Sequence, residues 1–291
     1  MVKGKAPHRH HYVPRMVQRN FVNEDGGLYF WRREFAVGEV RSTTPANLFV
    51  EDNLYSMVDG AGVRDAEIEV GFSRLESVAA PFIDKLLRVV RHGMIPILDE
   101  GSWDFWHHYN YYAQKRVSAW HERFLTQDDL FMVMKSIATK EQWAEHERMW
   151  AENREEALRV MRNSRIAAQV DPPPEDLLAE LHTRGLVIYV APSRTSFILG
   201  DDVGASAQIS TDRVNFMPIA CDMAVGYSAD KKSVRVERLT ASGVRRMNEA
   251  MTKKSYLIAG RSRAQIASLS RISYEAPDIL QGWQGRRQET A

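Results

Sequence analysis

Three histidines near the start of the chain are the residues best suited to chemistry. They stand at positions 8, 10 and 11, in the stretch HRHHYVPRMVQRNF. Neutral imidazole is the commonest metal ligand in proteins, and its pKa lies close to physiological pH. In a strand, His10 and His11 would point to opposite faces and do different jobs, whereas His8 and His10 would share a face. Apolar residues that need burial follow directly. We therefore expect these histidines to be held in place, either in a functional site or in structural roles.

The stretch FILGDDVG, at residues 197–204, is a second candidate. Three apolar residues lead into Gly200, Asp201 and Asp202. Carboxylates at the end of a strand can hold a metal ion or orient a histidine. A surface turn is the alternative, because aspartate and glycine are the usual turn residues.

An aromatic stretch that starts near residue 101 carries His107, His108, Arg116 and His121. Adjacent histidines on a helix lie about 100° apart, so both cannot easily bind one ion. Two zinc ligands would prefer a spacing of four residues. Most of this helix is expected to be core. Arg116 is the exception, because a cation near the aromatic face needs a carboxylate or a phosphate.

The elements that must position these side chains fall into three blocks. Short strands and turns are expected over residues 1–62, helices over about 64–183, and strands plus one helix over 186–275. Segregated runs of strands and helices favour an α+β fold. We predict a single α+β domain over residues 1–291. Its strand-rich N- and C-terminal parts would form one mixed sheet with the helical middle packed on it, which would bring the histidines close to the C-terminal strands.

Several local features of these blocks can be predicted. LYFWRR and GEVRSTT are expected to pair as a hairpin. Pro81 should kink or divide the helix in which it lies, and Ser102 is a plausible N-cap for the next one. The stretch ASGVRRMNEAMTKKS predicts an amphipathic helix with a basic face. The helix around Pro81 has apolar residues three and four apart, which predict one buried face: Ile68, Phe72, Leu75, Ala79, Phe82 and Leu86.

Composition sets limits on the class of protein. The chain has 291 residues, of which 44% are apolar and 26% charged, as is typical of a soluble globular protein. The net charge is only +1, so the whole molecule does not demand a polyanionic partner. Residues 231–271, however, hold eleven Lys or Arg against two acids. This region could bind phosphate, or its charges could form a solvated face or pair with acidic residues of the middle.

The number of cysteines and the length of the apolar runs indicate the cellular compartment. Cys221 is the single cysteine, so no intrachain disulfide can form, which fits a reducing cytoplasm. It lies in the apolar stretch FMPIACDMAV and is expected to be a small buried residue rather than a nucleophile. The N-terminal residues show no apolar secretory segment, and no run approaches 18 apolar residues. We expect a cytoplasmic protein with no membrane partner.

Several catalytic motifs are absent. The sequence has no GxGxxG, GxxxxGK[ST], HExxH, CxxC or GxSxG. P-loop nucleotide chemistry, zincin chemistry and α/β-hydrolase chemistry therefore have no support.

Seven stretches, in order along nearly the whole chain, resemble segments of a bacterial family catalogued as a domain of unknown function, DUF4238. They are HHYVPRMVQRNF, TPANLFVEDNLYS, FSRLESVAAPFIDKL, FWHHYNYYAQKRVS, FILGDDVG, VNFMPIACDMAVGYS and VRRMNEAM. The resemblance puts Glu76, Arg116, Asp201 and Asn248 on motif positions of the family. It implies a bacterial, single-domain, intracellular protein, and it implies no known reaction.

The chain departs from the family pattern around the aspartate. Leu199 and Gly200 stand where the family has Thr-Ser, and Asp202 and Val203 stand where it has Asn-Pro. A catalytic role for these four positions is therefore not implied, whereas Asp201 matches.

The first functional hypothesis is a metal-dependent hydrolase, such as a nuclease or phosphodiesterase. HHYVP loosely resembles the DHIVP start of HNH nucleases. That resemblance makes His10 the ligand of a divalent ion (Mg²⁺, Mn²⁺ or Zn²⁺), His11 the general base and Asn47 an orienting residue. The metal would neutralise developing charge while the imidazole takes the proton. The HNH pattern is incomplete, because no third histidine follows Asn47 at helical spacing.

A second arrangement of the same hydrolase draws on distant parts of the chain. His10, Asp201 and Glu76 would hold the metal, His11 would act as the base, and Arg116 would clamp a phosphate. It requires folding to bring the histidine pair and Asp201 into one hollow.

The second functional hypothesis is a non-catalytic binding module. The basic C-terminal helix and strands would contact nucleic acid, another phosphate-containing ligand or an acidic protein through the positive charges. The histidines would then be structural, donating hydrogen bonds to backbone carbonyls.

Overall fold

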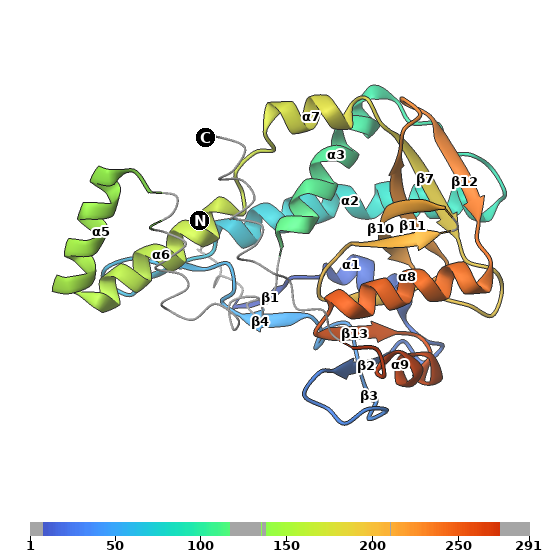
Figure 1. Ribbon diagram of the computed structural model, residues 1–291, viewed down its shortest axis with the longest axis horizontal. Helices are drawn as coiled ribbons and strands as arrows, with labels where there is room; N and C mark the ends of the chain where they lie inside the picture. Colours follow the sequence, from blue (N-terminus) through green and yellow to red (C-terminus); the bar gives the residue numbers. More distant parts are fainter. Residues whose placement is uncertain (1–7, 117–134, 136–137, 210, 274–291) are drawn as a thin grey trace, which may run out of the picture.

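The computed structural model describes residues 8–116, 135, 138–209 and 211–273, and it has the predicted α+β fold (Figure 1). Helices lie between a strand-rich N-terminal part and a strand-rich C-terminal part. Within the described ranges, no helix is both long and apolar enough to cross a lipid bilayer.

The N-terminal part is built from short elements. β2 and β3 pair antiparallel with Leu28 opposite Thr43, which confirms the predicted hairpin. Gly26 precedes β2 with φ +76°, a conformation that glycine adopts without steric cost. The elements are β1 (Arg9–His11), α1 (Arg15–Gln18), the 3₁₀ turn η1 (Arg19–Phe21), β2 (Leu28–Arg32), β3 (Arg41–Thr43), β4 (Val50–Asp52), β5 (Met57–Val58) and β6 (Arg64–Asp65).

The middle of the chain is helical, as predicted. α2 buries Ile68, Phe72, Ala79 and Leu86 of the expected face. Pro81 lies inside α2 without dividing it. A proline costs a helix interior about 3 kcal/mol, whereas each buried aliphatic side chain beyond it returns roughly 1.5–3 kcal/mol. The helices are α2 (Glu67–Arg91), α3 (Glu100–Lys115), α5 (Lys140–Glu152), α6 (Arg154–Ala168) and α7 (Glu175–Leu181).

The start of α3 differs from the prediction. Its N-cap is Asp99, whose carboxylate accepts a hydrogen bond from the backbone N–H of Ser102 at 2.8 Å. Ser102, the predicted cap, lies inside the first turn. A carboxylate three residues earlier satisfies one of the free N–H groups and interacts favourably with the helix dipole.

Over residues 185–209 and 211–273, the C-terminal part contains seven strands and two helices, not the single helix predicted. The additional helix is α9, capped by the Ser262 side chain, which accepts from the Gln265 N–H. The elements are β7 (Gly185–Val190), β8 (Leu199–Gly200), β9 (Ala205–Ile209), β10 (Asp212–Ala220), β11 (Met223–Ser228), β12 (Val234–Arg238), α8 (Ala241–Lys254), β13 (Leu257–Gly260) and α9 (Arg263–Leu269).

The strands form several sheets, so the prediction of one mixed sheet is wrong. A five-stranded sheet has the order β12-β7-β11-β10-β9 and comes from the C-terminal part alone. It is mixed, because β12 runs parallel to β7 while the other pairs are antiparallel. A four-stranded sheet, β3-β2-β13-β8, does join the two parts of the chain. Two pairs, β1-β4 and β5-β6, stand apart.

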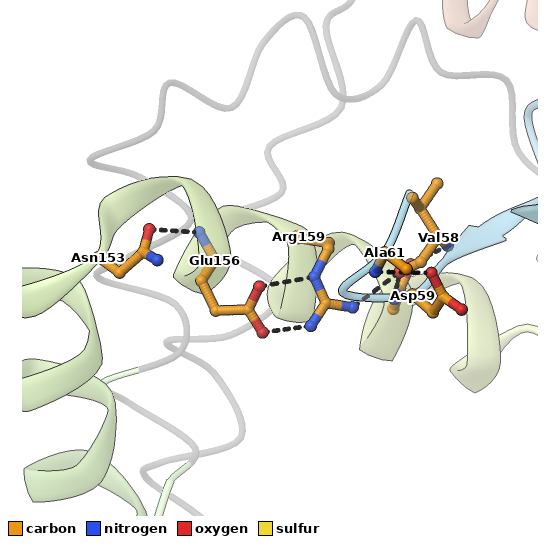
Figure 2. A network of polar contacts seen from close by, with 7 residues as sticks. Val58, Asp59, Ala61, Asn153, Glu156 and Arg159 are labelled. Atoms are coloured by element: carbon orange, nitrogen blue, oxygen red, sulfur yellow. Dashed lines mark hydrogen bonds and ion pairs between the residues drawn. The ribbon is translucent and has the colours of Figure 1, made fainter. Parts of the chain in front are cut away.

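Helix α6 is fixed to the β5–β6 pair by a polar network (Figure 2). Arg159 forms an ion pair with Glu156 on the same helix, and its Nη1 donates to the Val58 carbonyl at 2.7 Å. Asn163 donates to the same carbonyl and accepts from the Val58 N–H at 3.0 Å. In Figure 1, α5 and α6 extend away from the five-stranded sheet, and α5 buries no residue.

Candidate functional site

The N-terminal histidines lie on β1, which pairs with β4 so that His10 faces Glu51 across the ladder. His10 is fully buried. Its Nδ1 accepts a hydrogen bond from the Tyr55 N–H at 2.9 Å, and its ring stacks on the Tyr55 ring with centroids 5.7 Å apart. His10 is therefore held in place, as expected, and the Nδ1 lone pair is already used by the backbone.

His11 points to the other face of β1, as the strand geometry predicts. It is half-buried, and its Nε2 has no hydrogen-bond partner among the described residues. Burial lowers its pKa to about 4, and the positive charges of Arg15 and Arg9 act in the same direction. The imidazole is therefore neutral at pH 7. His8 lies on the exposed surface beside β1.

Arg116 joins β1 to helix α2. The Nη1 group of Arg116 is 2.5 Å from Glu76 Oε1, and Nη2 donates to the His11 carbonyl at 2.7 Å. The guanidinium lies over the Phe72 ring, 4.5 Å from its centroid, and the residue is only 2% exposed. The expected carboxylate partner of Arg116 is thus Glu76. Both Nη groups of Arg116 are therefore already hydrogen-bonded to the protein.

Glu69 lies beside Arg116 and was not predicted. Burial raises its pKa to about 7, against the opposing effect of Arg116. Within the described part of the chain, its Oε2 has no hydrogen-bond partner. The spacing of Glu69, Phe72 and Glu76 by three and four residues places all three on one helix face. That spacing is the signal that could have identified Glu69 from the sequence.

Asp201 lies directly after β8, as predicted, and is 3% exposed. Its Oδ1 accepts from the Tyr256 N–H at 2.9 Å, and its own N–H donates to the Leu257 carbonyl at 3.0 Å. Burial raises the pKa of this carboxyl to about 7, although these backbone bonds oppose the shift. These hydrogen bonds tie Asp201 to the segment that leads into β13.

The predicted metal ligands are not brought together. Among the residues that the structure describes, no group of three or more His, Cys, Asp or Glu side chains could hold a metal ion. Glu76 pairs with Arg116, and Asp201 bonds the β13 backbone. Asn47 is exposed and accepts from Arg9. The metal-dependent hydrolase thus stays a prediction that this geometry does not support.

The remaining candidate residues have structural surroundings. His107 is buried, as expected for core, with its Nδ1 3.0 Å from the Tyr227 hydroxyl. Asn248 donates to the Ser196 carbonyl at 2.8 Å and accepts from the Ile198 N–H, which fixes the segment before β8. Cys221 is half-buried rather than buried, so that prediction is wrong. His121 lies outside the described residues.

A basic pocket lies between β9 and α8. It has a volume of about 450 Å³. Its cations are Arg213, Arg246, Lys253 and Lys254, and the one acid in its described lining, Glu249, pairs with Arg245 at 2.6 Å. Three of these cations belong to the predicted basic helix. Arg213 comes from the start of β10, and sequence reasoning missed it because only the β9–β10 pairing brings it beside α8.

A polar pocket of about 460 Å³ adjoins the basic pocket on the five-stranded sheet. The two pockets share Ser206 and Lys254. α3 contributes Asn110 and Gln114, and β10 contributes Asn215. No sequence motif pointed to these amides, because they come from elements about 100 residues apart.

A family model for proteins of unknown function, DUF4238, matches residues 9–262. The chain belongs to the DUF4238 family. The matched region includes the histidine pair, Arg116, Asp201 and the lining of both pockets. No curated protein and no solved structure matches the chain. DUF4238 membership thus confirms the family resemblance and assigns no reaction.

Proposed function

We propose that this DUF4238 protein binds a phosphate-containing ligand in the basic pocket, the second of the two functions suggested by the sequence. The observation that supports it is the charge of the lining: four cations and one acid that is already paired. All four cations are exposed. Arg213 and Arg246 form no hydrogen bond or ion pair with the described part of the chain, so both guanidinium groups are available to a ligand.

Guanidinium groups suit phosphate because their planar N–H donors match its oxygens in pairs. Unpaired like charges held beside one another repel, and an anion between them removes that repulsion. The pocket volume falls within the usual range for small-molecule sites, roughly 300–1,000 Å³. The charge of the basic pocket, the geometry of its donors and its volume therefore all favour a phosphate-containing ligand.

The charge-reversal double variant Arg213→Glu/Arg246→Glu tests the proposal. Binding of inorganic tripolyphosphate and of a labelled single-stranded oligonucleotide would be measured at several salt concentrations. We expect affinity to fall by at least about tenfold for both probes. The slope of log affinity against log salt should decrease in magnitude by roughly two, one for each phosphate contact removed.

Arg238→Glu is the control for the single variant Arg213→Glu, because each substitution changes the net charge by two. Arg238 is exposed on β12, the strand at the opposite edge of the five-stranded sheet from β9. It changes the net charge without touching the pocket, so it should leave pocket binding nearly unchanged. If Arg238→Glu lowered the affinity for the two probes as much as Arg213→Glu does, the loss would reflect net charge alone. That result would contradict the proposal.

A further inference from the structure

We infer that the ligand is a nucleotide whose base occupies the polar pocket while its phosphates occupy the basic pocket. This inference rests on the proposed function and names its ligand. The two pockets meet at Ser206 and Lys254. A molecule with an anionic end and an uncharged end that lies across these two residues therefore reaches both pockets.

The polar pocket offers hydrogen-bonding groups of the kind that recognise a base edge. Gln114 and Asn110 lie one turn apart on α3, with Gln114 Nε2 2.5 Å from Asn110 Oδ1. Asn215 approaches from β10. Each side-chain amide provides two donors and one acceptor oxygen, and paired donor and acceptor groups are what Asn and Gln use to contact base edges.

The polar pocket also has a fixed aromatic side chain. Tyr227 of β11 lines it, and the hydroxyl of Tyr227 is 3.0 Å from His107 Nδ1. The His107 ring stacks on the Tyr227 ring with centroids 5.7 Å apart. A phenol ring fixed by these contacts provides a rigid surface for a flat, apolar ring face.

The two pockets differ in the net charge of their linings. Asp202 lines only the polar pocket, and its carboxylate is 3.0 Å from Lys254 Nζ at the shared boundary. The described lining of the polar pocket is thus neutral overall, whereas the basic pocket keeps the charges of Arg213 and Arg246. A neutral ring with hydrogen-bonding edges matches the first pocket, and phosphates match the second. A carboxylate at the junction is also an acceptor for sugar hydroxyl groups.

The same chemistry is offered by a free nucleotide and by an unpaired nucleotide of RNA or single-stranded DNA. A base-paired nucleotide is excluded, because its edge is already hydrogen-bonded and its faces are stacked. Duplex binding without single-strand or nucleotide binding would contradict the inference.

Isothermal titration calorimetry with the full chain tests the inference. The probes are the four common ribonucleoside triphosphates, inorganic tripolyphosphate, a single-stranded oligonucleotide and its duplex. We expect at least one nucleoside triphosphate to bind at least about tenfold more tightly than tripolyphosphate. The variant Gln114→Ala/Asn215→Ala changes two exposed side chains. It should abolish that difference and leave tripolyphosphate binding unchanged.

The outcomes separate this inference from the proposed function. Equal affinity for tripolyphosphate and all nucleotides, unaffected by the amide variant, overturns the nucleotide inference and leaves phosphate binding intact. If none of the phosphate-containing probes binds, both the nucleotide inference and the proposed phosphate binding are overturned. Tighter binding of the oligonucleotide than of any triphosphate supports nucleic acid as the source of the nucleotide, and the reverse order supports a free nucleotide. Asn47→Ala, an exposed amide outside both pockets, is the control.

Discussion

Arg116 is a buried charge whose partners all lie far from it in the sequence. Glu76 neutralises it from α2, and the His11 carbonyl accepts from it on β1. A buried charge is tolerated when it is paired and hydrogen-bonded, and it becomes costly when one partner is lost. At the residue scale, Arg116 thus holds β1, α2 and α3 together.

The substitution Arg116→Leu should destabilise the protein strongly. It leaves the Glu76 carboxylate and the His11 carbonyl without their donor, and breaking a buried ion pair costs roughly 3–5 kcal/mol. Urea denaturation of the variant and the parent protein measures the change in free energy of unfolding. The control is Arg184→Leu, which removes an exposed pair with Glu180, worth about 0–1 kcal/mol. Similar losses in the two variants would show that Arg116 is not structural.

Asp201 should make stability depend on pH. Burial raises its pKa from the ordinary aspartate value of 3.8 to about 7 in the folded chain. The folded state therefore binds its proton more tightly, and this group's contribution to stability falls as pH rises from about 4 to about 7, then levels off. Asp201→Asn keeps an acceptor for the Tyr256 N–H but does not ionise. The free energy of unfolding of the variant minus that of the parent should rise across that interval, by at most about 1.4 kcal/mol per pH unit.

Glu39→Gln should show the opposite sign. A hydrogen bond from Arg41 lowers the pKa of Glu39, so the stability that this group contributes is present at neutral pH and is lost as pH falls. The free energy of unfolding of Glu39→Gln minus that of the parent should become more negative as pH rises. For Asp201, the argument from burial would be contradicted if the free energies of unfolding of Asp201→Asn and of the parent changed in parallel with pH.

At the scale of elements, α8 positions most of the basic pocket. Thr240 caps it, with its hydroxyl accepting from the Gly243 N–H at 3.1 Å. Lys253 and Lys254 stand in its last turn, where cations interact favourably with the helix dipole. The buried face of α8, which includes Val244, Met247 and Met251, packs on β8 and β9. The apolar spacing of α8 was therefore predictable from the sequence, whereas the strands that pack against it were not.

The substitution Thr240→Ala should weaken α8 by about 1 kcal/mol, because one N–H at the helix start loses its acceptor. Thermal or urea unfolding measures the loss. Thr211→Ala, in the exposed turn between β9 and β10, removes a threonine hydroxyl that caps no helix and should change stability by less than about 0.5 kcal/mol. Equal effects of the two substitutions would argue against the cap.

The whole molecule is joined by contacts between its N-terminal and C-terminal parts. β2 pairs with β13, so residues about 230 positions apart are hydrogen-bonded neighbours. The Arg33 Nε donates to the Ser255 carbonyl at 3.2 Å. Asn20 Nδ2 donates to the Ile219 carbonyl at 3.0 Å, and the Asn20 carbonyl accepts from the Cys221 N–H. The expectation that the two parts meet is confirmed in the four-stranded sheet, although the strands of the two parts do not all join one sheet.

The substitution Asn20→Ala should destabilise the junction between η1 and β10 by about 1–3 kcal/mol, because a partly buried carbonyl loses its donor. Hydrogen exchange should also become faster at amides of β10 and of the N-terminal segment. Asn47→Ala, whose amide is exposed, should leave both measurements nearly unchanged. An Asn20 variant as stable as the parent would show that this hydrogen bond is dispensable.

The sequence by itself determined the kinds of elements and their order. Apolar spacing of three and four residues placed α2, α3 and α8, and turn residues placed the β2–β3 hairpin, because these patterns report how one segment buries its own face. Local charge likewise indicated the basic face of α8. Only the tertiary structure decided which polar groups come together: Arg116 with Glu76, Arg213 with Arg246 in the lining of one pocket, and Asp201 with the Tyr256 N–H. Such neighbours depend on how separate elements pack, and the local backbone pattern of either partner does not encode that packing.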